Sequence, residues 1–186
     1  LFVLSILIIN GQGFVLNNLL TPKQKQRVET LINPSSDPLG SGWNITQSKI
    51  AIGSGGLLGK GFLKGTQTSL NFVPIQSTDF IFSVIGEEFG YLGSMVFIIL
   101  YLIFLYRILI LSEAQKDRFA RVFGYSVFSI FLFHFTINIS MTLGLFPVIG
   151  IPLSLISYGG SSLLSFSLLL FVFLKLNGVK SAILGR

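Results

Sequence analysis

The residues whose types and spacing could do chemistry gather in one segment, residues 41–82. Its centre is the glycine-rich stretch GSGGLLGKG at residues 53–61, with further lysines close by. A glycine-rich backbone lets peptide amides approach an anion closely, and ammonium groups supply the opposite charge. The candidate ligands for a phosphate or pyrophosphate are therefore Lys49, Lys60, Lys64, Gly55 and Gly56. The alternative is a lysine-fringed loop that touches anionic lipid headgroups.

The glycine-rich stretch does not match a nucleotide-binding loop. Such a loop needs a glycine five residues before Gly59 and a serine or threonine directly after Lys60. Ser54 and Gly61 stand at these two positions. We therefore expect an anion other than a nucleotide.

Asp79 is the only acidic residue in residues 41–86, where every other charge is basic. It follows Ser77 and Thr78 at the point where a hydrophobic helix should begin, so any of the three could cap that helix. A carboxylate held by helix amides loses basicity. Capping and proton transfer are therefore competing roles for Asp79.

Other polar residues lie within hydrophobic runs. His134 and Asn138 are four residues apart, and Ser126 lies two turns earlier on the same helix face. Hydrogen bonding between helices is the first interpretation of this stripe, and a proton relay is the alternative. We expect Glu87 and Glu88 at the membrane interface or paired with a basic loop residue.

Residues 147–162 combine prolines and glycines with serines, which is unusual for a membrane segment. Irregular backbone at membrane depth is tolerated only where it is buried in protein or lines water. We therefore expect a cavity wall here. The candidate cavity-lining residues are Pro147, Pro152, Ser157, Gly159 and Gly160.

The composition is that of a membrane protein. Of the 186 residues, 51% are hydrophobic and 11% are charged, whereas a soluble domain carries roughly 25% charged residues. The chain has no cysteine, which excludes disulfides and thiolate metal sites, and one histidine cannot build a zinc site. The net charge of +6 fits membrane topology and lipid contact, so we expect no nucleic-acid partner and assign no metal ligand.

The hydropathy pattern predicts an all-α membrane protein, a polytopic helical bundle of about four spans with one large extracytoplasmic loop. Basic residues in short loops mark the cytoplasmic side. The expected order is a span at 1–20, the extracytoplasmic loop at 21–80, a span at 81–111, a cytoplasmic loop at 112–121, a span at 122–143, an extracytoplasmic connection at 144–152, a span at 153–174 and a cytoplasmic tail at 175–186.

Some local structure is expected within this order. The large loop should hold a short interfacial helix at 23–32 and a helical turn at 47–52, followed by irregular backbone. If the helix at 81–111 is continuous, Asp79 lies about 12 Å outward of Glu87.

The sequence resembles the SEDS family (shape, elongation, division and sporulation), which includes RodA, FtsW and SpoVE, and it is most similar to the RodA branch. The matching stretches are DPLGSGWN at 37–44, QSKIAIGSGG at 47–56, GKG at 59–61, GTQ at 65–67, TDFIF at 78–82, EE at 87–88 and residues 147–161. The chain departs from the family where Ser154 replaces a usual proline, and where no glutamate follows Pro74.

The resemblance implies a multi-pass protein of the bacterial cytoplasmic (inner) membrane that polymerises lipid II into glycan strands. It implies a class B penicillin-binding protein and other elongation-complex membrane proteins as partners. The family's catalytic aspartate corresponds to Asp79, and Thr78 beside it is a substrate-binding candidate. No cofactor is certain, although a divalent cation (Mg or Mn) is an option.

The resemblance also implies that this chain is the C-terminal part of a single, longer membrane domain, and we expect this part alone to be inactive. Two other functions stay open. One is a lipid II transporter, and the other is a non-catalytic scaffold for a class B transpeptidase.

Overall fold

The computed structural model describes residues 21–37, 40–70, 72 and 77–184. The helices are α2 (Pro22–Ile32), the short 3-10 helix η1 (Pro34–Ser36), α3 (Ser41–Ser54), α4 (Thr66–Ser69), α5 (Ile81–Glu113), α6 (Arg118–Thr142) and α7 (Gly160–Leu184). The described residues include no strand, which confirms the all-α prediction. The expected span at 1–20 lies outside these residues.

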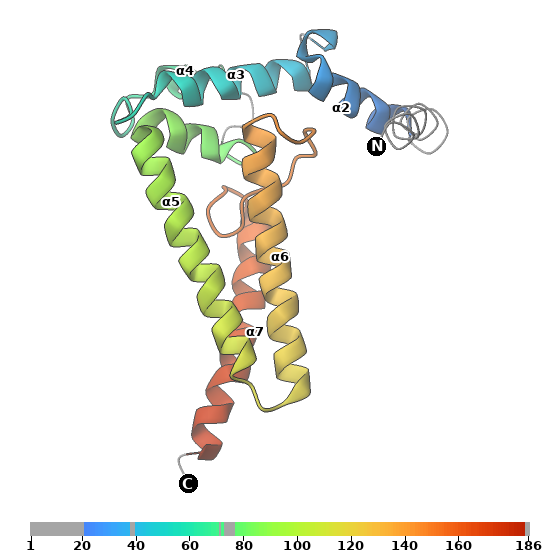
Figure 1. The fold of residues 1–186 in the computed structure, drawn as a ribbon, viewed down its shortest axis with the longest axis vertical. Coiled ribbons are helices and arrows are strands. Elements are labelled where there is room, and N and C mark those ends of the chain that lie inside the picture. The colour runs from blue at the N-terminus through green and yellow to red at the C-terminus, as the bar shows by residue number, and fades with distance from the viewer. Residues whose placement is uncertain (1–20, 38–39, 71, 73–76, 185–186) are drawn as a thin grey trace, which may run out of the picture.

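Three helices of the described part are long and apolar enough to cross a membrane. They are α5, α6 and the Gly160–Gly178 part of α7. Figure 1 shows these three running lengthwise, while α2, α3 and α4 lie across one end. The chain is therefore a multi-pass membrane protein whose polar helices cover one end of the bundle.

Aromatic side chains hold the bundle together. Tyr101 of α5 stacks on Phe135 of α6, with ring centroids 4.3 Å apart. Phe131 of α6 contacts Phe166 of α7, and both rings are buried. Burial of such rings contributes strongly to the packing of the three helices. This packing in turn determines the position of the polar segments at the end of the bundle.

A sharp bend divides α5. Gly90 has φ 66° and ψ −163°, a conformation that non-glycine residues avoid. The first two turns therefore run across the end of the bundle beside α3, and the helix then turns down into the membrane-length part (Figure 1). The expectation that Asp79 lies about 12 Å outward of Glu87 assumed that this segment runs along the bundle, whereas it runs across the end of the bundle, so the offset between the two residues is not directed outward.

The helix boundaries differ from the expected segments in several places: α4 lies where irregular backbone was expected, α6 begins inside the expected loop at 112–121, and α7 continues into the expected tail at 175–186. Helix α3 has 14 residues where one turn was expected at 47–52, because its Ile45 and Ala51 side chains are buried against neighbouring elements. Helix α7 begins at Gly160 instead of residue 153. Residues 150–157 are irregular, and their peptide groups bond to side chains of other elements and of the segment itself.

Candidate functional site

Asp79 lies in the turn that leads into α5. The residue before the first turn of α5 is Phe80, whose side chain is buried, and no side chain caps this helix. The capping role considered for Asp79 is therefore wrong. Its carboxylate is not held by the amides of α5, so it keeps the basicity that capping would have removed.

Three successive backbone carbonyls around Asp79 accept hydrogen bonds from distant parts of the chain. Tyr158 N donates to Ser77 O (2.8 Å), and Ser157 Oγ donates to Thr78 O (2.5 Å). Asn138 Nδ2 donates to Asp79 O (2.8 Å). The backbone of this turn is thus fixed by α6 and by the connection between α6 and α7.

Asn138 joins these elements. Its side chain is fully buried, and Nδ2 also donates to Ile151 O (2.8 Å). One turn away, His134 Nδ1 lies 3.2 Å from Pro152 O. Both residues therefore bond between elements, but to the turn before α5 and to the irregular connection instead of to another helix, and they tie that connection to α6. Ser126, the third residue of the stripe, bonds to Val122 O of its own helix.

The Asp79 carboxyl group is partly buried beside Gly150. A Cβ built on Gly150 would lie 3.1 Å from Asp79 Oδ2, and Gly150 has φ +80°. Burial raises the pKa of the Asp79 carboxyl, and a hydrogen bond with the Thr78 side chain offsets only part of that rise. A carboxylate with a raised pKa accepts a proton more readily, which suits a general base.

A basic cavity of about 380 Å³ shares Gly150 with this site. Lys23 and Arg27 of α2 line it, together with Val148 and Ile149 of the connection. Both basic side chains are exposed, and no ion pair is found for either within the described ranges. Asp37 also lines the cavity, and its carboxylate accepts from Ser41 N and Ser41 Oγ. The cavity therefore offers two basic groups and one acidic group, a net positive charge near Asp79.

The sequence reasoning did not single out Lys23 and Arg27. Their spacing of four residues places them on one face of an amphipathic helix, which is the signal that was available. The interpretation of α2 as an interfacial helix gave these charges a lipid-contact role, and nothing in the sequence alone showed that α2 faces residues 148–150.

Lys60 lies in a different environment from the one expected. Its Nζ forms an ion pair with Glu87 Oε1 at 2.6 Å and donates to Ser54 Oγ and Thr66 Oγ1, each at 2.7 Å. The pairing of Glu87 with a basic loop residue is thereby confirmed. The charge of Lys60 is balanced inside the fold, so it is not a free counter-charge for a ligand.

The glycines also serve packing. A Cβ on Gly55 would clash with the Gly86 carbonyl of α5. The amides of Gly55 and Gly56 donate to Ile52 O and Gly53 O. The glycine-rich stretch therefore docks on α5 and directs these two amides to its own chain, which does not fit the expected anion cradle.

The two remaining lysine candidates lie on the surface. Lys49 and Lys64 are exposed, and the described part of the chain contains no ion pair for either. Lys49 Nζ would lie 2.6 Å from a Cβ built on Gly144, which places it at the end of α6. Both stay candidates for contact with an anionic ligand or with headgroups.

The five expected cavity-lining residues fall in or beside the α6–α7 connection. Ser157 is buried and bonds to the Asp79 turn, and Pro152 O faces His134. Gly160 begins α7, and Pro147 and Gly159 are partly buried. Of these five, Ser157 has the most direct connection to Asp79, through the adjacent Thr78 carbonyl.

The described residues include no cluster of three or more His, Cys, Asp or Glu side chains that could hold a metal ion. The divalent cation considered from the sequence therefore has no assigned ligands in this part of the chain and stays a prediction.

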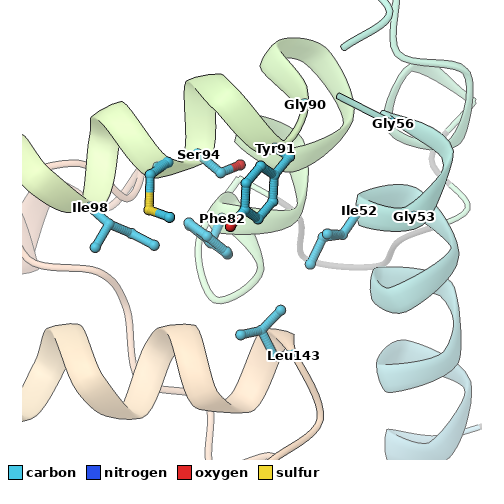
Figure 2. A pocket seen from close by; sticks show the side chains of 10 residues that line it. Ile52, Gly53, Gly56, Phe82, Gly90, Tyr91, Ser94, Ile98 and Leu143 are labelled. Atoms are coloured by element: carbon cyan, nitrogen blue, oxygen red, sulfur yellow. The ribbon is translucent and has the colours of Figure 1, made fainter. Parts of the chain in front are cut away.

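A separate apolar cavity of about 330 Å³ lies against the bend in α5. Figure 2 shows Phe82, Tyr91 and Ser94 of α5 around it, with Ile52 of α3 and Leu143, the residue after α6, on its other sides. No charged side chain lines it. It suits apolar contacts and is distinct from the basic cavity beside Asp79.

Comparison with known proteins places this site in context. Residues 1–181 match the family FTSW_RODA_SPOVE, described as cell cycle protein. The chain is 48% identical over 144 residues to peptidoglycan glycosyltransferase RodA of Treponema pallidum, covering 77% of this chain and 33% of that protein. It is 48% identical over 141 residues to peptidoglycan glycosyltransferase MrdB of Escherichia coli K12, covering 76% and 38%.

A solved structure is also similar. Its chain, from "Structural coordination of polymerization and crosslinking by a peptidoglycan synthase complex", matches with a TM-score of 0.71 and 30% identity. The match covers 94% of this chain and 47% of the solved one. The chain spans about a third of the length of the curated relatives described above.

Proposed function

Because the chain belongs to the FtsW, RodA and SpoVE family, we propose that it is the C-terminal part of a peptidoglycan glycosyltransferase that polymerises lipid II. Its similarity to RodA and MrdB, at 48% identity, against 42% for an FtsW relative, favours a role in cell elongation and rod shape. Two curated relatives with these names are glycosyltransferases, which supports the activity.

The observation that carries the proposal is the setting of Asp79. Its backbone is fixed by hydrogen bonds from α6 and the α6–α7 connection, its carboxyl has a raised pKa, and a basic cavity lies beside the adjacent Gly150. Glycosyl transfer from a lipid-linked pyrophosphate needs a base for the incoming hydroxyl and positive charge for the leaving group. This arrangement offers both.

The proposed step forms one bond and breaks one. The acceptor sugar hydroxyl attacks the anomeric carbon of the donor, Asp79 takes the hydroxyl proton, and the bond to the polyprenyl pyrophosphate breaks. Lys23 and Arg27 stabilise the negative charge on the departing pyrophosphate, with Lys49 and Lys64 as further candidates. Asp79 then releases its proton to water.

The setting of this reaction follows from the family. We propose that the protein lies in the bacterial inner membrane, that the basic connection between α5 and α6 faces the cytoplasm, and that α2, α3 and α4 lie outside. The partners proposed are a class B penicillin-binding protein and other membrane proteins of the elongation complex.

The test separates this activity from its alternatives. Purified full-length protein in detergent is supplied with lipid II, and the products are resolved by gel electrophoresis. Polymer formation is expected. A lipid II transporter would instead move labelled lipid II between the leaflets of liposomes without forming polymer. A scaffold would do neither, and Asp79→Ala would then leave cell growth unchanged.

The basic cavity has its own test. Lys23→Gln and Arg27→Gln should each raise the KM for lipid II by roughly tenfold, since a charge-assisted hydrogen bond contributes about 1.5–3 kcal/mol. The matched control is Lys116→Gln, because Lys116 is an exposed lysine in the α5–α6 connection, away from the site. Equal KM values for all three variants would contradict the assignment of this cavity.

A further inference from the structure

Two adjacent glutamates on the first two turns of α5 have opposite surroundings. Glu87 and Glu88 have exposed fractions of 0% and 7%. Glu87 accepts hydrogen bonds from Gln67 N (2.8 Å), Thr68 N (2.9 Å) and Lys60. Within the part of the chain that the structure describes, the Glu88 carboxylate has no hydrogen bond or ion pair. Among the described residues its oxygens are not counted with the enclosed polar atoms that lack a partner, so the carboxylate opens onto free space and can accept hydrogen bonds from a ligand.

Glu88 lines a cavity of about 290 Å³. The cavity lies between the start of α5 and the segment that contains α4. Its walls combine hydroxyl groups with apolar surface, and its lining includes Leu63, Ser69, Ser77, Ile81, Val84 and Glu88. The cavity therefore presents one negatively charged acceptor, small hydroxyl groups and an apolar wall.

The shape of this cavity is fixed by the neighbouring glutamate. Because Glu87 accepts from two successive amides of α4, it holds the α4 wall against α5. On the other side, Ser77 O accepts from Tyr158 N (2.8 Å). A site whose walls are held before a ligand arrives loses less free energy on binding.

The cavity adjoins the candidate catalytic turn. Ser77 and Ile81 line it, and these residues lie two positions before and two positions after Asp79. A group bound against Ser77 and Ile81 is thereby held next to the turn that carries the Asp79 carboxyl. A ligand in this cavity therefore lies beside the turn that carries the candidate catalytic carboxyl.

We infer that this cavity, called here the Glu88 cavity, is a subsite for one N-acetylhexosamine ring of the glycan substrate. The carboxylate of Glu88 accepts hydrogen bonds from sugar hydroxyl groups, and Ser69 and Ser77 can both donate and accept. Leu63, Ile81 and Val84 contact the apolar face of the ring or the acetyl methyl group. This inference rests on the proposed function, because sugar transfer is what gives a sugar subsite a use.

Size and charge select this ligand over others. A volume of about 290 Å³ is at the lower end of small-molecule sites, which span roughly 300–1,000 Å³, so it admits a single ring. The negative charge of Glu88 repels a pyrophosphate, whereas Lys23 and Arg27 attract one. A single carboxylate is also a poor set of ligands for a divalent cation, since calcium takes six to eight oxygens.

The test measures sugar binding apart from catalysis. Full-length protein in detergent is titrated with N,N′-diacetylchitobiose, and binding is followed by saturation-transfer difference NMR. Glu88→Gln should raise the Kd at least tenfold, because it removes a charged acceptor. Ser69→Phe should abolish binding by filling the cavity from an exposed position. The control is Glu113→Gln, an exposed glutamate at the far end of α5, which should change nothing.

Asp79→Asn separates the two proposals. It should lose polymerisation and keep diacetylchitobiose binding. If Asp79→Asn still polymerises lipid II while Glu88→Gln loses the sugar, the assignment of Asp79 fails and the Glu88 cavity stands. The subsite would be overturned if the unsubstituted protein does not bind diacetylchitobiose, or if Glu88→Gln and Ser69→Phe both bind it as tightly as the unsubstituted protein does.

Discussion

The ion pair between Lys60 and Glu87 gives a quantitative prediction. Glu87 is fully buried, and Lys60 Nζ lies 2.6 Å from its Oε1. Lys60→Met removes the positive partner and leaves a buried carboxylate held only by two amides and two threonine hydroxyls. Removing one partner of a buried pair costs about 3–5 kcal/mol. Since the Lys60 side chain is 25% exposed, we expect the lower end, about 3 kcal/mol.

This cost should fall on the contact between α4 and α5. The amides of Gln67 and Thr68 donate to Glu87, so they exchange with solvent only when that contact opens. A loss of about 3 kcal/mol makes such opening roughly a hundredfold more frequent, since each 1.4 kcal/mol is a factor of ten. Hydrogen–deuterium exchange of the full-length protein in nanodiscs, read on peptides that contain residues 66–69, measures this change.

The matched control for Lys60→Met is Lys64→Met. Lys64 belongs to the same loop, is exposed, and has no ion pair in the described part of the chain. Its substitution should leave the exchange rates within about twofold of the starting protein, because surface changes cost at most about 0.5 kcal/mol. Equal exchange rates in Lys60→Met and Lys64→Met would refute the view that this pair fixes the loop on α5.

Three further outcomes are expected. Because burial raises the pKa of folded Asp79, kcat/KM should fall as the pH drops through that raised pKa, which a pH–rate profile measures. The stability that Asp79 contributes should instead be lost as the pH rises through the same pKa, which melting temperatures at a series of pH values measure. Gly55→Ala should lower the Tm by a clash with Gly86, and Gly53→Ala, which has open space within 4 Å, should raise stability by up to about 1 kcal/mol. Asn138→Ala should lower the free energy of unfolding by about 2–4 kcal/mol, because the carbonyls of Asp79 and Ile151 lose their donor. It should also lower kcat more than it raises KM, and an unchanged kcat would count against a positioning role for Asn138.

The sequence was sufficient for the features that depend on composition. Long apolar runs predicted the membrane-length helices, because no other structure satisfies its backbone in lipid. The polar pair His134 and Asn138 was correctly expected to bond between elements, because a polar side chain in a span needs a partner. These inferences needed only local pattern and the properties of the bilayer.

The features that depend on tertiary contacts were not accessible in the same way. Gly90 could have lain in a straight helix, and only its fit against the 57–59 backbone gives it a positive φ. Lys60 and the glycines near it looked like ligands for an anion because their partners, Glu87 and Gly86, lie on a different element. Arg27 was missed for the converse reason, since its neighbours at 148–150 are over a hundred residues away in the chain.

The most direct measurement is lipid II polymerisation by the full-length protein with Asp79→Asn. This substitution keeps the shape of the side chain and the backbone hydrogen bonds of its turn, and it removes the base. Asp117→Asn is the control, because Asp117 caps α6 by accepting from Ala120 N, and asparagine caps equally well. A loss of about 10²–10⁴-fold in rate is expected for Asp79→Asn, with normal membrane insertion and a full rate for Asp117→Asn. Polymerisation at the same rate by both variants would contradict the assignment of Asp79 as the catalytic base.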